Sequence, residues 1–251
     1  MHSQESPIPR KLSKGARPDG SRLLNHLPET QRRSFIAECD TVELAFGQVL
    51  AEPDARIRDV YFPLTGFVSS IAPAGGDATL EVGLIGAEGM LGATLALGVN
   101  SAPVQALVQG AGSALHMSAA SLRRELRLRP ALRNILLRYC YVLLRQVTQT
   151  AACTHYHSIE ARLARWLLMT QDRSRGASLH LTQQFLSDML GVRRVGVSGA
   201  AGELQSRRLI GYHRGEIVVR DRRGLEAASC ACYANDKRLY EHTLGVKAGR
   251  S

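Results

Sequence analysis

The 251-residue sequence lacks several features that would restrict where the protein works. No run of about 18 apolar residues is present, so we expect no segment that crosses a bilayer and no membrane partner. The first twenty residues hold three prolines and four basic residues but no apolar stretch of the secretory type. The five cysteines are odd in number and scattered, so a disulfide framework is not expected. These absences favour a reducing, cytoplasmic environment.

Common catalytic motifs are also missing. The sequence shows no phosphate-binding loop, no HExxH pair and no paired carboxylates. Residues 196–199 superficially resemble a nucleophile elbow, but they lack the G-x-S-x-G spacing and follow a predicted helix rather than a strand. We therefore expect no catalytic residue, and an enzyme is the less favoured class.

Basic residues are absent from the middle of the chain and concentrated after it. Residues 59–122 contain no Lys or Arg and four acidic residues, whereas residues 159–224 contain twelve Lys or Arg against six Asp or Glu. Such a basic region attracts polyanions through counterion release. Although a positive face is often only a solvated surface, this one coincides with the motif described next, which favours DNA as the partner.

Residues 181–221 have the order of a winged helix-turn-helix. Thr182 is suited to cap a first helix, and Gly191 can take the left-handed conformation that ends it. A second helix, starting near Arg193, is followed by short strands at 209–212 and 216–220, with Arg214 on the wing between them, near phosphates. The inward positions are Phe185, Leu186, Met189 and Leu190 on the first helix, and Val197, Ala200, Ala201 and Leu204 on the second.

Two aspects of this motif leave alternatives open. Two short helices and a hairpin also occur in the core of other α+β domains, and here the wing and the charge favour the DNA-binding interpretation. Gly196, Gly199 and Gly202 lower the helix propensity of the second helix by roughly 1 kcal/mol each relative to Ala. That helix must therefore be held by packing or be ordered by DNA.

The first half of the chain has a β texture. Short β segments separated by glycines predict a small barrel or roll, preceded by a helical region at 23–39 that Pro28 interrupts. A short helix capped by Ser118 and ending near Arg129 follows the roll. The predicted strands are residues 42–46, 60–62, 67–71, 80–85, 104–108 and 114–117.

A much longer helix starts at Pro130 and carries two apolar stripes. Two stripes indicate two partners, which we interpret as the roll and the same helix of a second chain, and this predicts a homodimer. Complete burial in one domain is the alternative, and Arg133, Arg138 and Arg145 argue against it. The stripes are Leu132, Leu136, Tyr139 and Leu143, and Leu137, Cys140, Leu144, Val147 and Ala151. Another amphipathic helix is predicted at 159–171.

The layout resembles the Crp/Fnr family of bacterial transcription regulators. The resemblance is carried by VYFPLTGFVS at 60–69, EVGLIGAEGMLG at 81–92, HSIEARLARWLL at 157–168 and the helix-turn-helix. It implies an α+β protein with a cyclic-nucleotide-binding-like β-roll, a long dimerisation helix and a winged helix-turn-helix. The expected boundaries are a disordered tail at 1–22, the roll sensor at 23–129, the dimerisation helix at 130–154, the DNA-binding domain at 155–225 and a C-terminal extension at 226–251.

The resemblance also implies partners and site residues. The expected partners are a near-palindromic double-stranded DNA operator, a second copy of the chain and RNA polymerase. Arg194 matches the arginine that family members commonly direct at a guanine, but Val195 and Gly199 replace an acidic residue and a second arginine, so the operator cannot be transferred. The predicted DNA-binding residues are Thr182, Gln183, Arg193, Arg194, Val195, Ser198, Arg207 and Arg214. The predicted dimerisation residues are Leu136, Tyr139, Leu143 and Val147.

The expected effector pocket departs from the family pattern. Glu88 could match the acid that contacts ribose in cyclic-nucleotide-binding relatives, but no Lys or Arg lies between Arg58 and Arg123 to neutralise a phosphate. Burying a phosphate beside Glu88 without a counter-charge is costly unless backbone amides or a partner chain compensate it. We predict that cyclic AMP is not the ligand, that the effector is another signal, or that the roll works without one. The pocket residues implied are Gly86, Glu88, Gly89, Ser101 and Ala102.

Three further possibilities concern metals and specificity. Cys153, His155 and His157 lie close in sequence, but an ordinary helix explains them, and Cys230-x-Cys232 has the wrong spacing for a knuckle or redox pair. The sequence also lacks the N-terminal cysteine cluster of the oxygen-sensing relatives. We therefore expect no metal and no cofactor, with a metal- or haem-based redox or gas sensor as a minor alternative. A nonspecific architectural DNA binder remains the other alternative.

Overall fold

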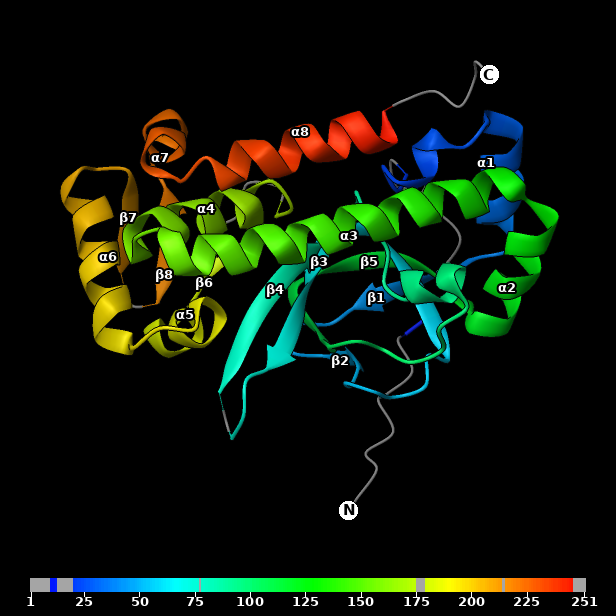
Figure 1. Ribbon diagram of the computed structural model, residues 1–251, viewed down its shortest axis with the longest axis horizontal. Coiled ribbons are helices and arrows are strands. Elements are labelled where there is room, and N and C mark those ends of the chain that lie inside the picture. The colour runs from blue at the N-terminus through cyan, green and yellow to red at the C-terminus, as the bar shows by residue number, and fades with distance from the viewer. Residues whose placement is uncertain (1–9, 13–19, 77, 175–178, 214, 246–251) are drawn as a thin grey trace. The chain divides into compact units, whose positions relative to one another are not determined.

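The computed structural model describes residues 10–12, 20–76, 78–174, 179–213 and 215–245 (Figure 1). The chain divides into two compact units. The roll unit comprises Met1–Ser70, Ile85–Leu144 and Tyr240–Ser251, and the winged unit comprises Ile71–Leu84 and Arg145–Leu239. No helix in these described residues is long and apolar enough to cross a membrane.

Strands dominate the roll unit. The strands of this part of the chain are β1 (Asp40–Leu44), β2 (Val49–Ala51), β3 (Asp59–Pro73), β4 (Thr79–Ile85) and β5 (Gln105–Ser118). The last three residues of β3, and β4 up to Leu84, belong to the winged unit. Within the described residues the sheet order is β1-β5-β3-β4, and β2 also pairs with β5 (Figure 1). The β prediction is confirmed, but two pairs of predicted strands, 60–62 with 67–71 and 104–108 with 114–117, are each one long strand.

Glycines explain why the predicted strands merge. Gly66 has a φ of 72°, and a Cβ there would lie 2.2 Å from the carbonyl oxygen of Gly110. A Cβ at Gly112 would lie 2.2 Å from the carbonyl oxygen of Thr65. The glycines therefore allow two long strands to pass very close together, where the sequence suggested turns.

The helices of the roll unit begin largely where the sequence predicts. They are η1 (Leu24–His26), α1 (Glu29–Ala37), η2 (Ala93–Leu97), α2 (Ala119–Leu128) and the first part of α3 (Pro130–Tyr156). The Ser118 hydroxyl accepts a hydrogen bond from the Ser121 amide at 3.1 Å, which confirms the predicted cap of α2. Pro130 opens α3, as expected from its fixed φ.

The predicted N-terminal tail is too long. Ser21 is fully buried, and the Arg22 guanidinium lies 2.9 Å from Glu88. Lys11 forms an isolated bridge with Val42 in β1 and pairs with Asp40. The described part of residues 1–22 therefore packs on the roll, while residues 1–9 and 13–19 of the predicted tail lie outside the described residues.

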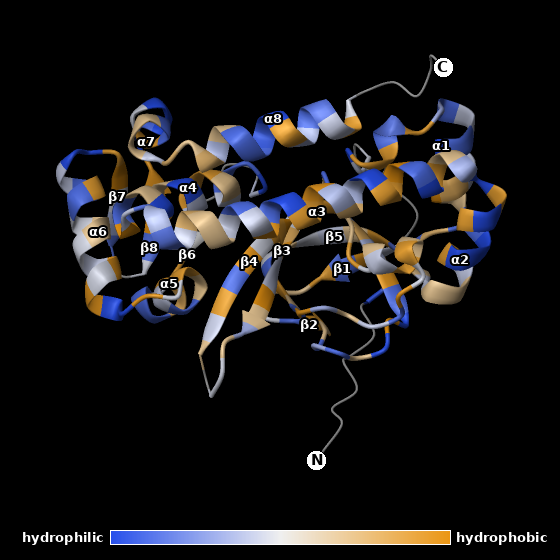
Figure 2. Cartoon of the chain, in the orientation of Figure 1, coloured by the Kyte–Doolittle hydropathy of each residue, from blue (hydrophilic) through white to orange (hydrophobic). Residues whose placement is uncertain are grey.

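The apolar residues of α3 divide differently from the prediction. Leu136 and Tyr139, predicted to form the dimer interface, lie in the core of the roll unit together with Leu132, and Leu143 is half-buried against that core. Of the four predicted dimerisation residues only Val147 is exposed, at 46%. Figure 2 shows the alternation of hydrophobic and hydrophilic residues along this helix. Leu136 and Tyr139 are not available to a second chain, because the core of the roll unit already buries them.

The winged unit is built around α4 (Ile159–Gln171), whose bounds match the prediction. Its buried core includes Leu163, Leu167, Leu186 and Leu204. The remaining elements are β6 (Leu179–His180), α5 (Gln183–Leu190), α6 (Arg194–Ser206), β7 (Ile210–His213), β8 (Glu216–Val219), α7 (Arg222–Ala228) and α8 (Cys232–Leu244) (Figure 1). In the described part of this unit the strands pair in the order β6-β8-β7.

The unit boundary and the C-terminal segment differ from the expected domains. The division falls inside α3, after Leu144, and the winged unit also takes in residues 71–84. Within that unit, the Trp166 indole donates a hydrogen bond to Glu81 at 2.7 Å. Tyr233 of α8 donates to Asp172, next to the end of α4, at 2.8 Å. The predicted C-terminal extension thus contributes to the packing of the winged unit.

Candidate nucleic-acid interface

The turn between α5 and α6 is formed by the residues that the sequence indicates. The Thr182 hydroxyl accepts a hydrogen bond from the Phe185 amide at 3.1 Å, which satisfies an otherwise free donor of the first turn. Gly191 ends α5 with a φ of 61°, and the Val192 amide donates to the Ser187 carbonyl at 3.0 Å. This left-handed ending reverses the chain and allows α6 to begin at Arg194.

The start of α6 exposes polar and basic side chains. Arg193, at the N-cap position, and Arg194 are both exposed, and Val195 is 76% exposed although it is apolar. The side-chain oxygen Oε1 of Gln183 accepts hydrogen bonds from Ser198 Oγ at 2.9 Å and from Arg194 Nε at 3.4 Å. We refer to Gln183, Arg193, Arg194, Val195 and Ser198 as the α6 corner. It combines cationic side chains with the positive end of a helix dipole, which suits a polyanion.

Packing holds α6 in place, as its glycine content requires. The predicted inward residues Val197, Ala200, Ala201 and Leu204 are buried in the core of the winged unit. A Cβ at Gly196 would lie 2.7 Å from the Ile159 side chain of α4, so glycine permits the two helices to approach closely. Gly199 and Gly202 have no atom within 4 Å of that position. One of the three glycines therefore has a packing role.

Other predicted DNA-binding residues lie outside the α6 corner. Arg207 follows α6 at its far end, about 20 Å along the helix axis from Arg194, and pairs with Glu160 at 2.6 Å. Arg214 lies outside the described residues. On the wing, Tyr212 donates a hydrogen bond to the Leu181 carbonyl at 3.1 Å. Burial raises the pKa of Tyr212 despite the nearby positive charge of Arg194, so this phenol stays protonated near neutral pH.

Sequence analysis considered two pairs of side chains separately and missed that they form one group in the winged unit. Cys153 and His157 lie close to Cys230 and Cys232, and one nitrogen or sulfur atom of each lies within 4.8 Å of the others. The four-residue spacing of the first pair was visible in the sequence, but no local pattern connects it to a pair more than 70 positions away. His155, considered with them, is exposed and instead stacks edge-on with Tyr156.

The predicted effector residues of the roll unit are engaged by the chain itself. Glu88 pairs with Arg22 and accepts a hydrogen bond from the Gly86 amide at 3.1 Å, and the Tyr240 hydroxyl donates to the Glu88 carbonyl at 2.7 Å. A Cβ at Gly89 would lie 2.1 Å from the Tyr139 hydroxyl oxygen. We refer to residues 86–89 as the Glu88 turn. Its polar groups are largely satisfied from within the roll.

Two basic side chains from outside residues 59–122 reach this part of the roll. Arg22 lies at Glu88, and Arg123 of α2 donates to Asn100 at 2.6 Å, beside the predicted pocket residues Ser101 and Ala102. Ala102 is buried, and Ser101 forms an isolated backbone bridge with Arg56. The chain segments before and after the roll supply these cations, which counting between Arg58 and Arg123 could not reveal.

Residues 161–228 match the family model of the Crp-like helix-turn-helix domain. This segment contains α4 from Ala161 onward, the complete α6 corner and the described strands of the wing. The chain therefore carries a Crp-like helix-turn-helix domain, as its sequence pattern predicts.

Several solved structures share the fold of the chain. FixK2 of Bradyrhizobium japonicum is 18% identical, with a TM-score of 0.63, covering 77% of this chain and 98% of its own. The c-di-GMP-responsive regulator CLP of Xanthomonas campestris is 17% identical, with a TM-score of 0.62 and coverages of 76% and 99%. A CooA mutant from Carboxydothermus hydrogenoformans is 13% identical, with a TM-score of 0.57 and coverages of 87% and 97%. No match was found among curated protein sequences. At these identities the likeness defines the fold: a β-roll, a long helix and a Crp-like helix-turn-helix.

Proposed function

We propose that the protein is a sequence-specific DNA-binding transcription regulator that acts as a homodimer. The observation that carries this proposal is the exposed α6 corner at the N-terminal end of the second helix of a Crp-like domain. In helix-turn-helix proteins this end of the recognition helix enters the major groove. The solved structures with the same fold include regulators, which supports the assignment to transcription.

Each residue of the α6 corner has a proposed role. Arg194 donates two hydrogen bonds to the O6 and N7 atoms of a guanine, and its contact with Gln183 orients the guanidinium. Val195, exposed and apolar, contacts a thymine methyl group. Arg193 binds a backbone phosphate. Arg207 is not among the base-reading residues in this proposal, because its guanidinium is already paired with Glu160.

The dimer is proposed to form through the exposed face of α3. Tyr141, Leu144 and Val147 are 50%, 64% and 46% exposed and follow one another at three-residue steps of the helix. Large apolar side chains at this spacing are typical of a helix that packs against a second copy of itself. Two α6 corners would then enter successive major grooves of a near-palindromic operator, about 34 Å apart.

The roll is proposed to act as the sensor or as a dimerisation platform that contacts RNA polymerase. We maintain that its signal is not cyclic AMP, because the Glu88 carboxylate is already engaged by Arg22 and the Gly86 amide, and the Tyr139 hydroxyl occupies the space beside Gly89. An effector would act by binding one dimer geometry better than the other. Micromolar binding of cyclic AMP in calorimetry would contradict this part of the proposal.

The experiment that tests the proposed function is selection of binding sites from a random duplex library with the purified full-length protein. We expect enrichment of a near-palindromic site whose affinity, at matched salt, exceeds that for scrambled duplex by about 10³-fold or more. An affinity ratio near one would instead identify a nonspecific architectural DNA binder, because phosphate contacts alone do not discriminate between sequences.

A further inference from the structure

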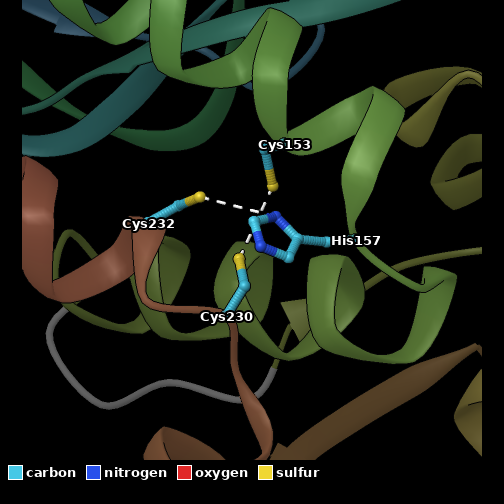
Figure 3. A group of neighbouring side chains, drawn as sticks. All are labelled: Cys153, His157, Cys230 and Cys232. Atoms are coloured by element: carbon cyan, nitrogen blue, oxygen red, sulfur yellow. Dashed lines mark hydrogen bonds between the residues drawn. The ribbon is translucent and has the colours of Figure 1, made fainter.

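Three thiols and one imidazole converge at the junction of two helices in the winged unit. Cys153 is in the last turn of α3 and His157 follows that helix, whereas Cys230 precedes α8 and Cys232 is its first residue. The four side chains point toward one another (Figure 3). Cys153, Cys230 and Cys232 are 2%, 8% and 1% exposed, so solvent hardly reaches the group.

The distances within the group match a single tetrahedral ion. Cys153 Sγ lies 3.5 Å from Cys230 Sγ, Cys232 Sγ lies 3.6 Å from His157 Nδ1, and all four atoms lie within 4.8 Å of one another. With zinc–sulfur bonds of about 2.3 Å, two thiolates on one tetrahedral ion lie about 3.8 Å apart. An iron–sulfur cluster distributes its ligands over several irons and needs a wider cage. The cysteines are free thiols, and 3.5 Å far exceeds the disulfide length of about 2.05 Å.

The surroundings of the group suit a metal thiolate site. Gln149 Nε2 donates to Cys232 Sγ at 3.0 Å, the kind of outer contact that orients a ligand. The buried Arg162 and Arg165 both interact electrostatically with Cys153, and Arg165 pairs with Asp236 at 2.7 Å. One Zn²⁺ held by three thiolates and a neutral imidazole carries a single negative charge, and the two buried guanidinium groups lie close enough to stabilise it. Cys232, at the N-terminal end of α8, is also placed where the helix dipole favours a thiolate.

We propose that Cys153, His157, Cys230 and Cys232 bind one Zn²⁺ ion in a closed Cys₃His site. Three cysteines and one histidine fill all four positions of tetrahedral zinc, so the site is structural and leaves no position for a substrate. The three thiols release their protons when the ion binds. The ion fixes the end of α3, which leads into the DNA-binding helices, to the start of α8. This proposal is independent of the proposed function in DNA binding.

The test is the zinc content of the full-length protein, purified with a non-thiol reductant and without chelator. Elemental analysis and native mass spectrometry should find one zinc ion per chain. Cys232→Ser and His157→Gln should lose stoichiometric zinc, whereas the matched controls Cys39→Ser, Cys140→Ser and His155→Gln should retain it. Arg194→Ala should also retain zinc, so that failure of the metal site and failure of the DNA interface are distinguishable.

A second variant covers the case in which loss of a ligand prevents folding. His157→Cys keeps four ligands and should still bind one ion, and in the cobalt-substituted protein its sulfur-to-cobalt absorption should rise by roughly one third as three thiolates become four. Reduced protein that stays metal-free when zinc is supplied would overturn the proposal. Stoichiometric iron in place of zinc, a Cys153–Cys230 disulfide in protein purified with reductant, or equal zinc loss in the Cys39 and Cys140 controls would also overturn it.

Discussion

The Glu88 turn and the α6 corner differ in whether their charged groups are paired within the chain or exposed. At the Glu88 turn the carboxylate is paired with Arg22 and bonded to the Gly86 amide, so the chain satisfies its own charge. At the α6 corner Arg193 and Arg194 are exposed, and Arg194 is held by a neutral glutamine. A surface that binds an external anion must keep cations available, which only the second region does. This difference is why we place the function at α6.

Disrupting the dimer should have the largest effect on operator binding by the α6 corner. Leu144→Glu places a charge on the exposed face of α3, so we expect a monomer that reads one half-site and binds the full operator about 10²-fold to 10⁴-fold more weakly. Arg133→Glu, an exposed change elsewhere on the same helix, is the control. Ultracentrifugation and operator binding give the two readouts. A Leu144→Glu protein that remains dimeric would place the interface elsewhere.

Substitutions at two glycines of α6 distinguish the contribution of packing from that of helix propensity to stability. Gly196→Ala forces a methyl group against Ile159 and should destabilise the protein by about 1 kcal/mol, since the neighbouring side chain must move. Gly202→Ala meets nothing within 4 Å and should stabilise it by about 0.4–1 kcal/mol through helix propensity. Chemical denaturation measures both. The change in unfolding free energy should therefore have opposite signs at the two positions. Destabilisation by Gly202→Ala would show that its surroundings are tighter than described.

Removing Arg22 tests the Glu88 turn, and we expect it to have the smallest effect of these changes. Arg22→Met deprives the buried Glu88 of its ionic partner, but the arginine is 58% exposed, so we expect a loss of only about 1 kcal/mol in unfolding free energy. Operator affinity should not change. Lys11→Met, which breaks an exposed pair with Asp40, should have no measurable effect on stability. A large loss of operator affinity in Arg22→Met would show that the two regions are coupled.

Local signals explain what could be predicted from the sequence. Thr182, Gly191 and Pro130 act within one turn of the chain, and the structure places each at the predicted helix end. Gly66 was ambiguous, because glycine serves both a turn and a close crossing of strands, and only the position of Gly110 decides between them. A sequence pattern therefore predicts a structural feature when the interacting residues are close together in the sequence.

Long-range contacts explain what could not be predicted. Arg22 reaches Glu88 across 66 positions, and Cys153 reaches Cys230 across 77. Neither pairing follows from spacing or propensity, because each depends on how distant segments pack. Likewise, the two stripes of α3 were visible in the sequence, but which stripe faces the roll was decided by the roll's core.

The central claim, that the α6 corner reads DNA sequence, is tested most directly by the affinity of Arg194→Ala for the selected operator and for random duplex at the same salt concentration. A bidentate guanine contact is worth about 1–3 kcal/mol, so operator affinity should fall by about 5-fold to 150-fold while affinity for random duplex changes little. Arg207→Ala, paired with Glu160 at the far end of α6, should leave the ratio of the two affinities unchanged. Equal losses on both DNAs for Arg194→Ala would make Arg194 a phosphate contact and contradict the account.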